Sequence, residues 1–441
     1  MFNFIGKHKI GILGDANSGK TVFLTSLLWN LKERKLKLGT EKKAPTDVKI
    51  HDLKDEHAFD YAGNKRKCKN SNKWPAKTVD DYSLAKCSYR LEDSFFQRDL
   101  TFVDIPGERM ADLLIWQCVD YEEWSEEMLR SWRESDIIST YMQDYVGLLS
   151  DENSTGEQLS WEYKKGMRHL INNYIPQISP STLIFDNGKA EAPSDIDNDS
   201  WLKKRSIWRH DDQACDFFPL PTDWRDWNKE LYESCENNYE LYRRKVIKPL
   251  FSQIGSCDHF IICIDVLGIL AQSPGNYLKV KEELEYFFNK ITPSFWRHLW
   301  DRIGRNPMRI AFVATKSDLV YGDNLQHLKD LLKDLVTSFV TEKIEFGYFT
   351  CTAWTSTKEG EGEYQGLAVA TILEEDGNGK QRQADVVLKC PPLPEEWPPD
   401  WKGEQYAHFL MEMLPSVIIA NPPKQTGIDD ILNFVTGDGK E

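Results

Sequence analysis

An eight-residue loop near the start of the chain carries the residue types that bind phosphate groups. It runs from Gly14 to Thr21 and fits the pattern G-x-x-x-x-G-K-[ST]. The glycines allow the backbone to curl so that its N–H groups point inward at phosphate oxygens. Lys20 can then reach the β- and γ-phosphates of a nucleotide, and the Thr21 hydroxyl can bind Mg²⁺. The expected phosphate-binding residues are Gly14, Asp15, Ala16, Asn17, Ser18, Gly19, Lys20, Thr21 and Val22.

A second segment, Asp104-Ile105-Pro106-Gly107, follows an apolar run and fits the pattern D-x-x-G. A carboxylate at the end of a strand beside the first loop can hold Mg²⁺, directly or through water. A glycine three residues later lets the backbone N–H approach a γ-phosphate closely. The pattern alone is common in turns, and it is informative here because the phosphate loop precedes it. We therefore expect Asp104 and Gly107 to complete the phosphate and metal site.

A third segment, Thr315-Lys316-Ser317-Asp318, follows another apolar run and fits the pattern [NT]-K-x-D. The carboxylate of Asp318 can accept hydrogen bonds from N1 and N2 of guanine, whereas adenine offers no matching pair of donors. The stem of Lys316 can cover the plane of the base, and Thr315 can bond to the backbone of the phosphate loop. The alternative is a solvated turn in which Asp318 caps a helix.

The hydrophobic pattern predicts a scaffold that brings the three segments together. Apolar or alternating runs predict strands at residues 9–13, 82–91, 100–104, 260–264, 309–314 and 344–349. Helical periodicity occurs at residues 21–31, 277–291, 324–340 and 428–435. Strands that alternate with helices predict a mostly parallel sheet with both faces covered. The carboxyl ends of such strands share one edge of the sheet, where ligands bind.

Several stretches depart from this alternation. From about residue 111 to residue 252 the pattern is helical, aromatic and charged, and residues 230–254 predict one long helix with a break near Pro249. Residues 92–99 predict the turn of a hairpin, and residues 197–212 predict a loop. A long loop with some helix is expected at residues 35–75, and the tail from residue 376 is rich in Gly and Pro.

Composition limits the classes of function. The chain has 441 residues, a formal net charge of −15 and 40% hydrophobic residues, which is typical of a globular protein. The acidic balance argues against a general nucleic-acid or anionic-membrane binder. Nine scattered cysteines without a CxxC pair predict buried thiols and no zinc site. No apolar run is long enough to span a membrane, the first residues do not resemble a signal peptide, and we expect a cytoplasmic protein.

In their order, the three motifs resemble those of Ras-like GTPases, and the whole chain resembles the YcjX-like P-loop proteins of bacteria. The stretches that carry the second resemblance are residues 17–23, 104–109, 218–221, 246–251, 264–267, 314–318 and 427–434. It implies an α/β fold, a P-loop NTPase whose Ras-like G domain carries a large α-helical insertion. The expected parts are the first half of the G domain (1–110), the insertion (111–254), the second half of the G domain (255–375), and a Pro/Gly-rich segment with a C-terminal helix packing on the G domain (376–441).

The resemblance also extends the site. Thr352, Ala353 and Trp354 occupy the slot in which a backbone N–H of GTPases meets O6 of guanine. Trp354 stands where these proteins have Lys, and it either stacks on the base or packs in the core. The segment from Trp74 to Thr78 resembles the W-P-x-x-T segment of the family. It implies that Thr78 binds Mg²⁺ and the γ-phosphate, and the alternative is a turn threonine.

Lys20, Glu108 and Thr78 are the expected catalytic residues. Small GTPases carry Gln just after D-x-x-G, where this chain has Glu108. A carboxylate can orient water or act as a base, but it adds negative charge beside the γ-phosphate, so slow hydrolysis is the alternative. Arg109 is expected to form a surface salt bridge, with an arginine-finger role as the alternative. Asn17 matches a position at which some GTPases help to hold K⁺, and its alternative is an ordinary loop residue.

The sequence therefore predicts a guanine-nucleotide-binding protein that hydrolyses GTP with Mg²⁺. It would act as a switch on an unidentified protein partner through the insertion. One alternative is a nucleotide-regulated interaction protein with negligible hydrolysis. Another is a kinase, an ATPase or a promiscuous NTPase, against which Asp318 argues. No H-E-x-x-H or G-x-S-x-G motif supports a metalloprotease or a serine hydrolase.

Overall fold

The computed structural model covers most of the chain. It describes residues 6–438 except 15–16, 56, 72–73, 76–81, 93, 95, 135, 173–179, 182–184, 187–188, 191–198, 212, 273, 275–276, 279, 282–283, 286–307, 338–343, 376–380, 390, 411–417 and 420. The expected helix at 277–291 lies largely outside these residues. In the part that is described, no helix is both long enough and apolar enough to cross a membrane.

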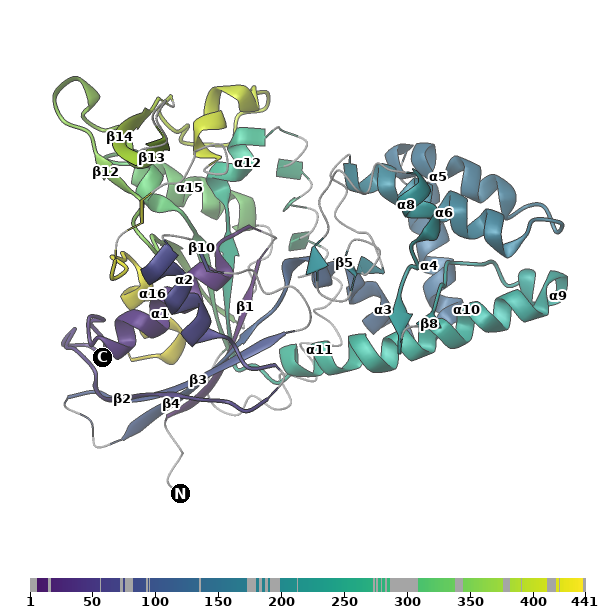
Figure 1. The fold of residues 1–441 in the computed structure, drawn as a ribbon, viewed down its shortest axis with the longest axis horizontal. Helices are drawn as coiled ribbons and strands as arrows, with labels where there is room; N and C mark the ends of the chain where they lie inside the picture. The colour runs from purple at the N-terminus through teal and green to yellow at the C-terminus, as the bar shows by residue number, and fades with distance from the viewer. Residues whose placement is uncertain are drawn as a thin grey trace.

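A seven-stranded, mostly parallel sheet forms the centre of one half of the molecule (Figure 1). Across the sheet the strands are β11 (Ile344–Thr350), β10 (Met308–Ala314), β9 (His259–Ile264), β1 (Lys7–Leu13), β4 (Gln97–Asp104), β3 (Ser83–Arg90) and β2 (Thr46–His51). The strands from β11 to β4 pair in parallel, whereas β3 and β2 pair antiparallel at one edge. The predicted strands and the predicted hairpin of β3 and β4 are confirmed.

Helices cover both faces of the sheet because the inner strands are apolar on both sides. Ile12 on β1 and Val313 on β10 pack with the helices of one face, α1 (Lys20–Lys32) and α16 (Ile428–Thr436). Phe260 on β9 and Phe312 on β10 point the other way. That face is covered by α11 (Lys248–Ile254), α12 (Val266–Gln272) and α15 (Asn324–Val336). The α/β architecture is therefore the expected one, a central sheet between two layers of helices.

The segment between β4 and β9 forms the helical insertion, at the right of Figure 1. Its helices are α3 (Leu113–Gln117), α4 (Tyr121–Glu134), α5 (Asp136–Leu148), α6 (Gly156–Asn172), α8 (Asp199–Lys204), α9 (Trp224–Trp227) and α10 (Lys229–Tyr242). Its short strands are β5 (Phe185–Asp186), β6 (Lys189–Ala190), β7 (Arg209–His210) and β8 (Gln213–Ala214). Many of its aromatic side chains, such as Trp124 and Tyr239, are fully buried and pack on one another. These rings form a core.

The predicted long helix is present, and its irregularity lies just before Pro249. After α10 the chain forms a π-helix, η3 (Arg243–Ile247), and then continues as α11. Proline has no N–H to donate to the preceding turn, which explains an altered hydrogen-bond pattern on its N-terminal side. Figure 1 shows α10 and α11 as one long rod that joins the insertion to the sheet.

Some elements were not anticipated. A long loop with some helix was expected at residues 35–75, where helix α2 (Tyr61–Ser71) fits the expectation and strand β2 does not. Helix α8 lies in the expected loop at 197–212. A second, three-stranded sheet comprises β12 (Thr357–Glu359), β13 (Ala368–Glu375) and β14 (Gln381–Leu388). Its hairpin of β13 and β14 spans the expected boundary between residues 375 and 376, so that boundary divides one structural unit.

Candidate functional site

The predicted phosphate-binding loop, residues 14–21, is called the phosphate loop below. It begins where β1 ends, and glycine is required at two of its positions. Gly14 has φ of +138°, and a Cβ atom there would lie 2.1 Å from the carbonyl oxygen of Cys263. Gly19 has φ of +87° and precedes the first residue of α1. Residues other than glycine rarely adopt these backbone conformations. Asp15 and Ala16 lie outside the described residues.

Asn17 has φ of 67°, a left-handed conformation that Asn adopts more readily than most residues. This conformation accounts for Asn without a bound cation. The K⁺ role remains a prediction.

Lys20 and Thr21 open helix α1 and face the loop. The Lys20 ammonium donates to the carbonyl of Gly14 at 2.6 Å, and the side chain is 8% exposed. The Thr21 hydroxyl donates to a carboxylate oxygen of Asp104 at 3.5 Å. Val22, the next predicted residue, packs beside the cluster of Trp29 and Trp354.

Asp104 lies beside Thr21 because β1 and β4 are parallel neighbours. Ile12 on β1 lies opposite Asp104 on β4, so the two strands end side by side. Asp104 is fully buried. After it, the backbone N–H of Ile105 donates to the carbonyl of Ile12, and Gly107 begins a 3-10 helix, η1 (Gly107–Asp112). The side chain of Glu108 and the whole of Thr78 lie outside the described part, so their predicted roles stay predictions.

The third segment follows β10, two strands from β1 across the sheet. The hydroxyl of Thr315 donates to the carbonyl of Ile264 at 3.4 Å, so the predicted bond to the phosphate loop is not the one formed. Thr315 nevertheless lies against that loop, 3.9 Å from where a Cβ atom on Gly19 would be. Lys316 has φ of 59° and forms an ion pair with Asp265 at 2.5 Å.

Asp318 is held by a residue that no motif indicated. One of its carboxylate oxygens accepts the backbone N–H and the hydroxyl of Ser356, each at 2.7 Å. Burial raises the pKa of Asp318, and the bonds from Ser356 partly offset this rise. Asp318 lies inside the short helix η4 (Ser317–Leu319), where no side-chain cap bond is present, so the helix-cap alternative is not what the structure shows.

Thr352, Ala353 and Trp354 follow β11 beside this segment. The hydroxyls of Ser317 and Thr352 are 2.8 Å apart, which joins the two loops. The carbonyl of Ala353 accepts the hydroxyl of Ser26 on α1. Trp354 is 3% exposed and packs edge-on against Trp29, with ring centres 5.5 Å apart. Of the two readings of Trp354, packing in the core is the one that the structure shows.

Arg109 differs from its expected place at the surface. It is 7% exposed, and its guanidinium lies within hydrogen-bonding distance of Ser181 and Tyr242 of the insertion. A buried arginine with such partners is neither a surface salt bridge nor a finger that points at a phosphate.

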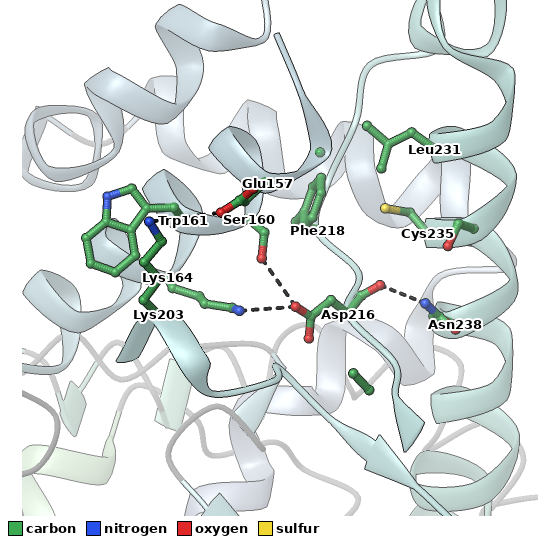
Figure 2. Close-up of a pocket in the computed structure, with 13 residues that line it drawn as sticks. Glu157, Ser160, Trp161, Lys164, Lys203, Asp216, Phe218, Leu231, Cys235 and Asn238 are labelled. Atoms are coloured by element: carbon green, nitrogen blue, oxygen red, sulfur yellow. Dashed lines mark hydrogen bonds and ion pairs between the residues drawn. The ribbon is translucent and has the colours of Figure 1, made fainter. Parts of the chain in front are cut away.

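The insertion contains a cavity of about 380 Å³ between α6, α8 and α10 (Figure 2). Asp216 lines this cavity. Its carboxylate accepts hydrogen bonds from the Lys164 ammonium at 3.1 Å and from the Ser160 hydroxyl at 3.2 Å. Asn238 on α10 donates to the Asp216 carbonyl at 2.8 Å. Because its partners lie on both helices, Asp216 links α6 to α10.

A sequence model of the YcjX-like family, DUF463, matches residues 8–439. The match covers nearly the whole chain. It includes the phosphate loop, the helical insertion and the segment of Asp318.

Proposed function

The chain belongs to the YcjX-like family, and from this premise and the site geometry we propose that it binds guanine nucleotides and hydrolyses GTP to GDP and phosphate with Mg²⁺. The carrying observation is the meeting of Lys20, Thr21 and Asp104 where two parallel strands end. Asp318 lies beyond the end of a third strand of the same sheet, so phosphate and base can be bound along one edge. The insertion that follows η1 would carry the signal to a protein partner.

The sheet is compatible with a Ras-like G domain. Its five parallel strands are followed on one side by the antiparallel strand β3. The large insertion lies between β4 and β9, the two neighbours of the strand that leads into the phosphate loop. This arrangement supports the proposal. It also favours a switch, because the insertion directly follows the D-x-x-G loop in the chain.

The residues beside the phosphate loop fit a magnesium ion. Thr21 and Asp104 present a hydroxyl and a carboxylate oxygen 3.5 Å apart, and hard oxygen ligands of this kind suit Mg²⁺. Bound there with the phosphates, the ion would neutralise charge that develops on the phosphate oxygens. Phosphoryl transfer depends mainly on positioning and on such charge stabilisation, so little covalent chemistry is required of the protein.

The chain itself would supply the remaining charge and the base selectivity. Lys20 is placed to exchange its bond with the Gly14 carbonyl for bonds to phosphate oxygens. Backbone N–H groups at the start of α1 favour an anion at the same place. Asp318, oriented by Ser356, would accept two hydrogen bonds from guanine. The bonds from Ser356 favour the charged form of the Asp318 carboxyl group, whereas burial raises its pKa.

Replacement of Asp318 tests the base site. We expect wild-type protein with Mg²⁺ to bind a fluorescent GTP analogue far more tightly than the ATP analogue. Asp318→Asn should weaken GTP binding at least about 100-fold, since a buried acceptor is replaced by a donor that faces guanine N–H groups. Asp330→Asn on the exposed side of α15 is the matched control and should bind GTP as wild type does. Equal binding of GTP and ATP, unaffected by Asp318→Asn, would contradict the guanine assignment.

A second function is favoured by Glu108 in place of Gln. The chain would then bind GTP as a signal and hydrolyse it negligibly. Single-turnover hydrolysis by wild type and Glu108→Gln separates the two functions. A faster Gln variant indicates that slow hydrolysis belongs to the natural protein, and a slower one indicates that Glu108 takes part in the reaction.

A further inference from the structure

The D-x-x-G loop leads directly into a buried polar cluster that joins it to the insertion. Arg109 and Asp112 lie on η1, Ser181 lies between α6 and α8, and Tyr242 is the last residue of α10. Arg109 is 7% exposed, and the other three residues are fully buried. These four residues are called the Arg109 cluster below.

The hydrogen bonds of the Arg109 cluster have one consistent set of directions. The carboxylate of Asp112 accepts the backbone N–H of Ser181 at 2.8 Å, the hydroxyl of Ser181 at 2.6 Å and the hydroxyl of Tyr242 at 2.7 Å. The guanidinium of Arg109 donates to the same two hydroxyls, at 3.0 Å and 3.4 Å. Each hydroxyl therefore donates to the carboxylate of Asp112 and accepts from the guanidinium of Arg109. Two parts of the insertion each supply one bridge between the charged groups of η1.

Burial makes these bridges important for the position of η1. The guanidinium and the carboxylate are 3.9 Å apart and out of water, where an ionised group without hydrogen-bond partners is costly. The hydroxyls of Ser181 and Tyr242 each bind both charged groups and so help to keep them buried in this position. Gly107, whose N–H is expected at the γ-phosphate, is the first residue of the same short helix.

Tyr242 is itself fixed by the aromatic core of the insertion. Its ring lies edge-on to Trp208 with centres 5.2 Å apart, and 5.4 Å from the ring of Phe217. The π-helix η3 starts at the next residue and leads through α11 toward β9. π-Helical turns are rare and occur frequently at functional sites. The hydroxyl of Tyr242 thus lies at the junction of the insertion core, the π-helix and η1.

We propose that the Arg109 cluster positions the D-x-x-G loop, so that the insertion governs GTP hydrolysis. By linkage, binding of the γ-phosphate would then also change the insertion. The inference rests on the proposed function, since it concerns the rate of the same reaction. Arg109, Asp112, Ser181 and Tyr242 act on the loop through packing and hydrogen bonds, and they are positioning residues.

The first test measures the position of the loop without nucleotide. Tyr242→Phe removes one hydroxyl and keeps the ring, and amide hydrogen exchange of residues 105–112 should become about tenfold faster. The matched control is Tyr145→Phe, which removes a buried hydroxyl that donates to the carbonyl of Pro219 at 2.7 Å inside the insertion. That variant loses a hydrogen bond between two residues of the insertion, neither of which lies on η1, and exchange of residues 105–112 should stay at the wild-type rate.

The second test measures the reaction. Single-turnover GTP hydrolysis should be about tenfold slower in Tyr242→Phe and in Ser181→Ala, because a displaced loop misplaces the reacting groups. The affinity for GDP should stay within about twofold, because GDP has no γ-phosphate for the loop to contact. Tyr145→Phe should leave both quantities unchanged. A purely structural role would lower thermal stability in all three variants without this division between hydrolysis and GDP binding.

The results separate the two proposals. If Tyr242→Phe matches Tyr145→Phe in amide exchange and in hydrolysis, the positioning role is overturned. If wild-type protein binds no guanine nucleotide, the proposed function is overturned. In that case the exchange measurement on nucleotide-free protein still decides whether the Arg109 cluster holds the loop.

Discussion

Gly14 brings the phosphate loop close to the neighbouring strand β9. A Cβ atom on Gly14 would lie 2.1 Å from the Cys263 carbonyl, and φ is +138°. Gly322 also has a positive φ, +58°, but no atom lies within 4 Å of its Cβ position. Gly322 therefore measures the cost of a left-handed conformation alone, whereas Gly14 combines a conformation open almost only to glycine with a clash.

Gly14→Ala should destabilise the protein by about 3 kcal/mol and abolish nucleotide binding, because the backbone of the loop must move. Gly322→Ala should cost about 1–2 kcal/mol, the typical penalty of a left-handed conformation, and leave binding intact. Urea unfolding and nucleotide titration measure both effects. Equal losses of stability in the two variants would rule out a steric role for Gly14.

Asn17 allows a test of the predicted K⁺ site. If K⁺ takes part, single-turnover GTP hydrolysis should be faster in KCl than in NaCl at equal ionic strength, and Asn17→Gly should remove the difference. Gly tolerates the φ of 67° without strain, so it keeps the loop conformation. Equal rates in the two salts for wild type would end this hypothesis and leave Asn17 as a loop residue.

Sequence patterns located the site where motif residues are close in sequence. Lys20 and Thr21 are adjacent, and Asp104 ends an apolar strand, so the position of each could be predicted. Ser356 and the partners of Arg109 could not be predicted in the same way. Ser181 and Tyr242 lie 72 and 133 residues beyond Arg109, and only the packing of the insertion brings them together. The burial of Trp354 likewise depends on Trp29, which is far away in sequence.

At the scale of elements, strands β1 and β9 are joined near their starts by two histidines. Nδ1 of His8 and Nε2 of His259 are 3.2 Å apart, and Nδ1 of His259 accepts the backbone N–H of Arg309. Since Nδ1 of His259 accepts, its Nε2 carries the proton and donates to His8. Burial lowers the pKa of His259 to about 3, with His8 and Arg309 adding to the effect, and burial also lowers the pKa of His8.

These pKa values predict a loss of stability in mild acid. Above pH 6.5 the imidazole of His259 is neutral in both the folded and the unfolded chain, so it adds no pH dependence. Below pH 6.5 the unfolded chain takes up a proton that the folded chain takes up only near pH 3. The free energy of unfolding should fall by up to about 1.4 kcal/mol per pH unit in this window. His259→Asn keeps an acceptor for Arg309 and should show a smaller slope in urea unfolding between pH 4 and 7. An unchanged slope would contradict the assignment.

The segment that follows α16 is held to the β3–β4 hairpin by a largely buried ion pair. Arg98 on β4 lies 2.8 Å from Asp438, which also accepts the hydroxyl of Tyr89 on β3. Asp438→Ala should cost about 3 kcal/mol, because it leaves a buried guanidinium without its partner. Asp430→Ala removes an exposed partner of Lys42 and should cost less than about 1 kcal/mol. Thermal unfolding measures both, and similar costs would contradict the role of the pair.

The predictability of the elements follows from their burial. Strand β9 is buried along its whole length, and its apolar run was recognised. Strand β2 alternates between exposed and partly buried residues at the edge of the sheet and contains Asp47 and Lys49, so no apolar run marks it. Strand β14 lies in the tail that the sequence marked only as rich in Gly and Pro, and its pairing with β13 gives it order.

At the scale of the whole molecule, one hydrophobic core extends from the sheet into the insertion. Rings of the insertion such as Trp124 belong to the same buried cluster as Phe312 on β10. Trp116 on α3 stacks on Phe251 on α11 with ring centres 5.6 Å apart, which links the insertion to the helix beside the sheet. The insertion is therefore expected to be part of one cooperative unit.

This continuity predicts a single unfolding transition. Tryptophan fluorescence, to which the insertion contributes eight of the fifteen tryptophans, and far-UV circular dichroism should give the same midpoint in urea. Phe251→Ala should lower that common midpoint and make the two probes diverge, because it removes a large contact between the parts. Two separate transitions in wild type would show that the insertion unfolds independently.

The two connections of the insertion have a mechanical consequence. One follows β4 and the other precedes β9, and these strands flank β1 on both sides. Tension applied to the insertion by a bound partner would therefore enter the sheet on either side of the strand that carries the phosphate loop. A pull directed along the strands would act in shear on the hydrogen bonds that join β4 and β9 to β1, and it would reach β1 before it reached the outer strands.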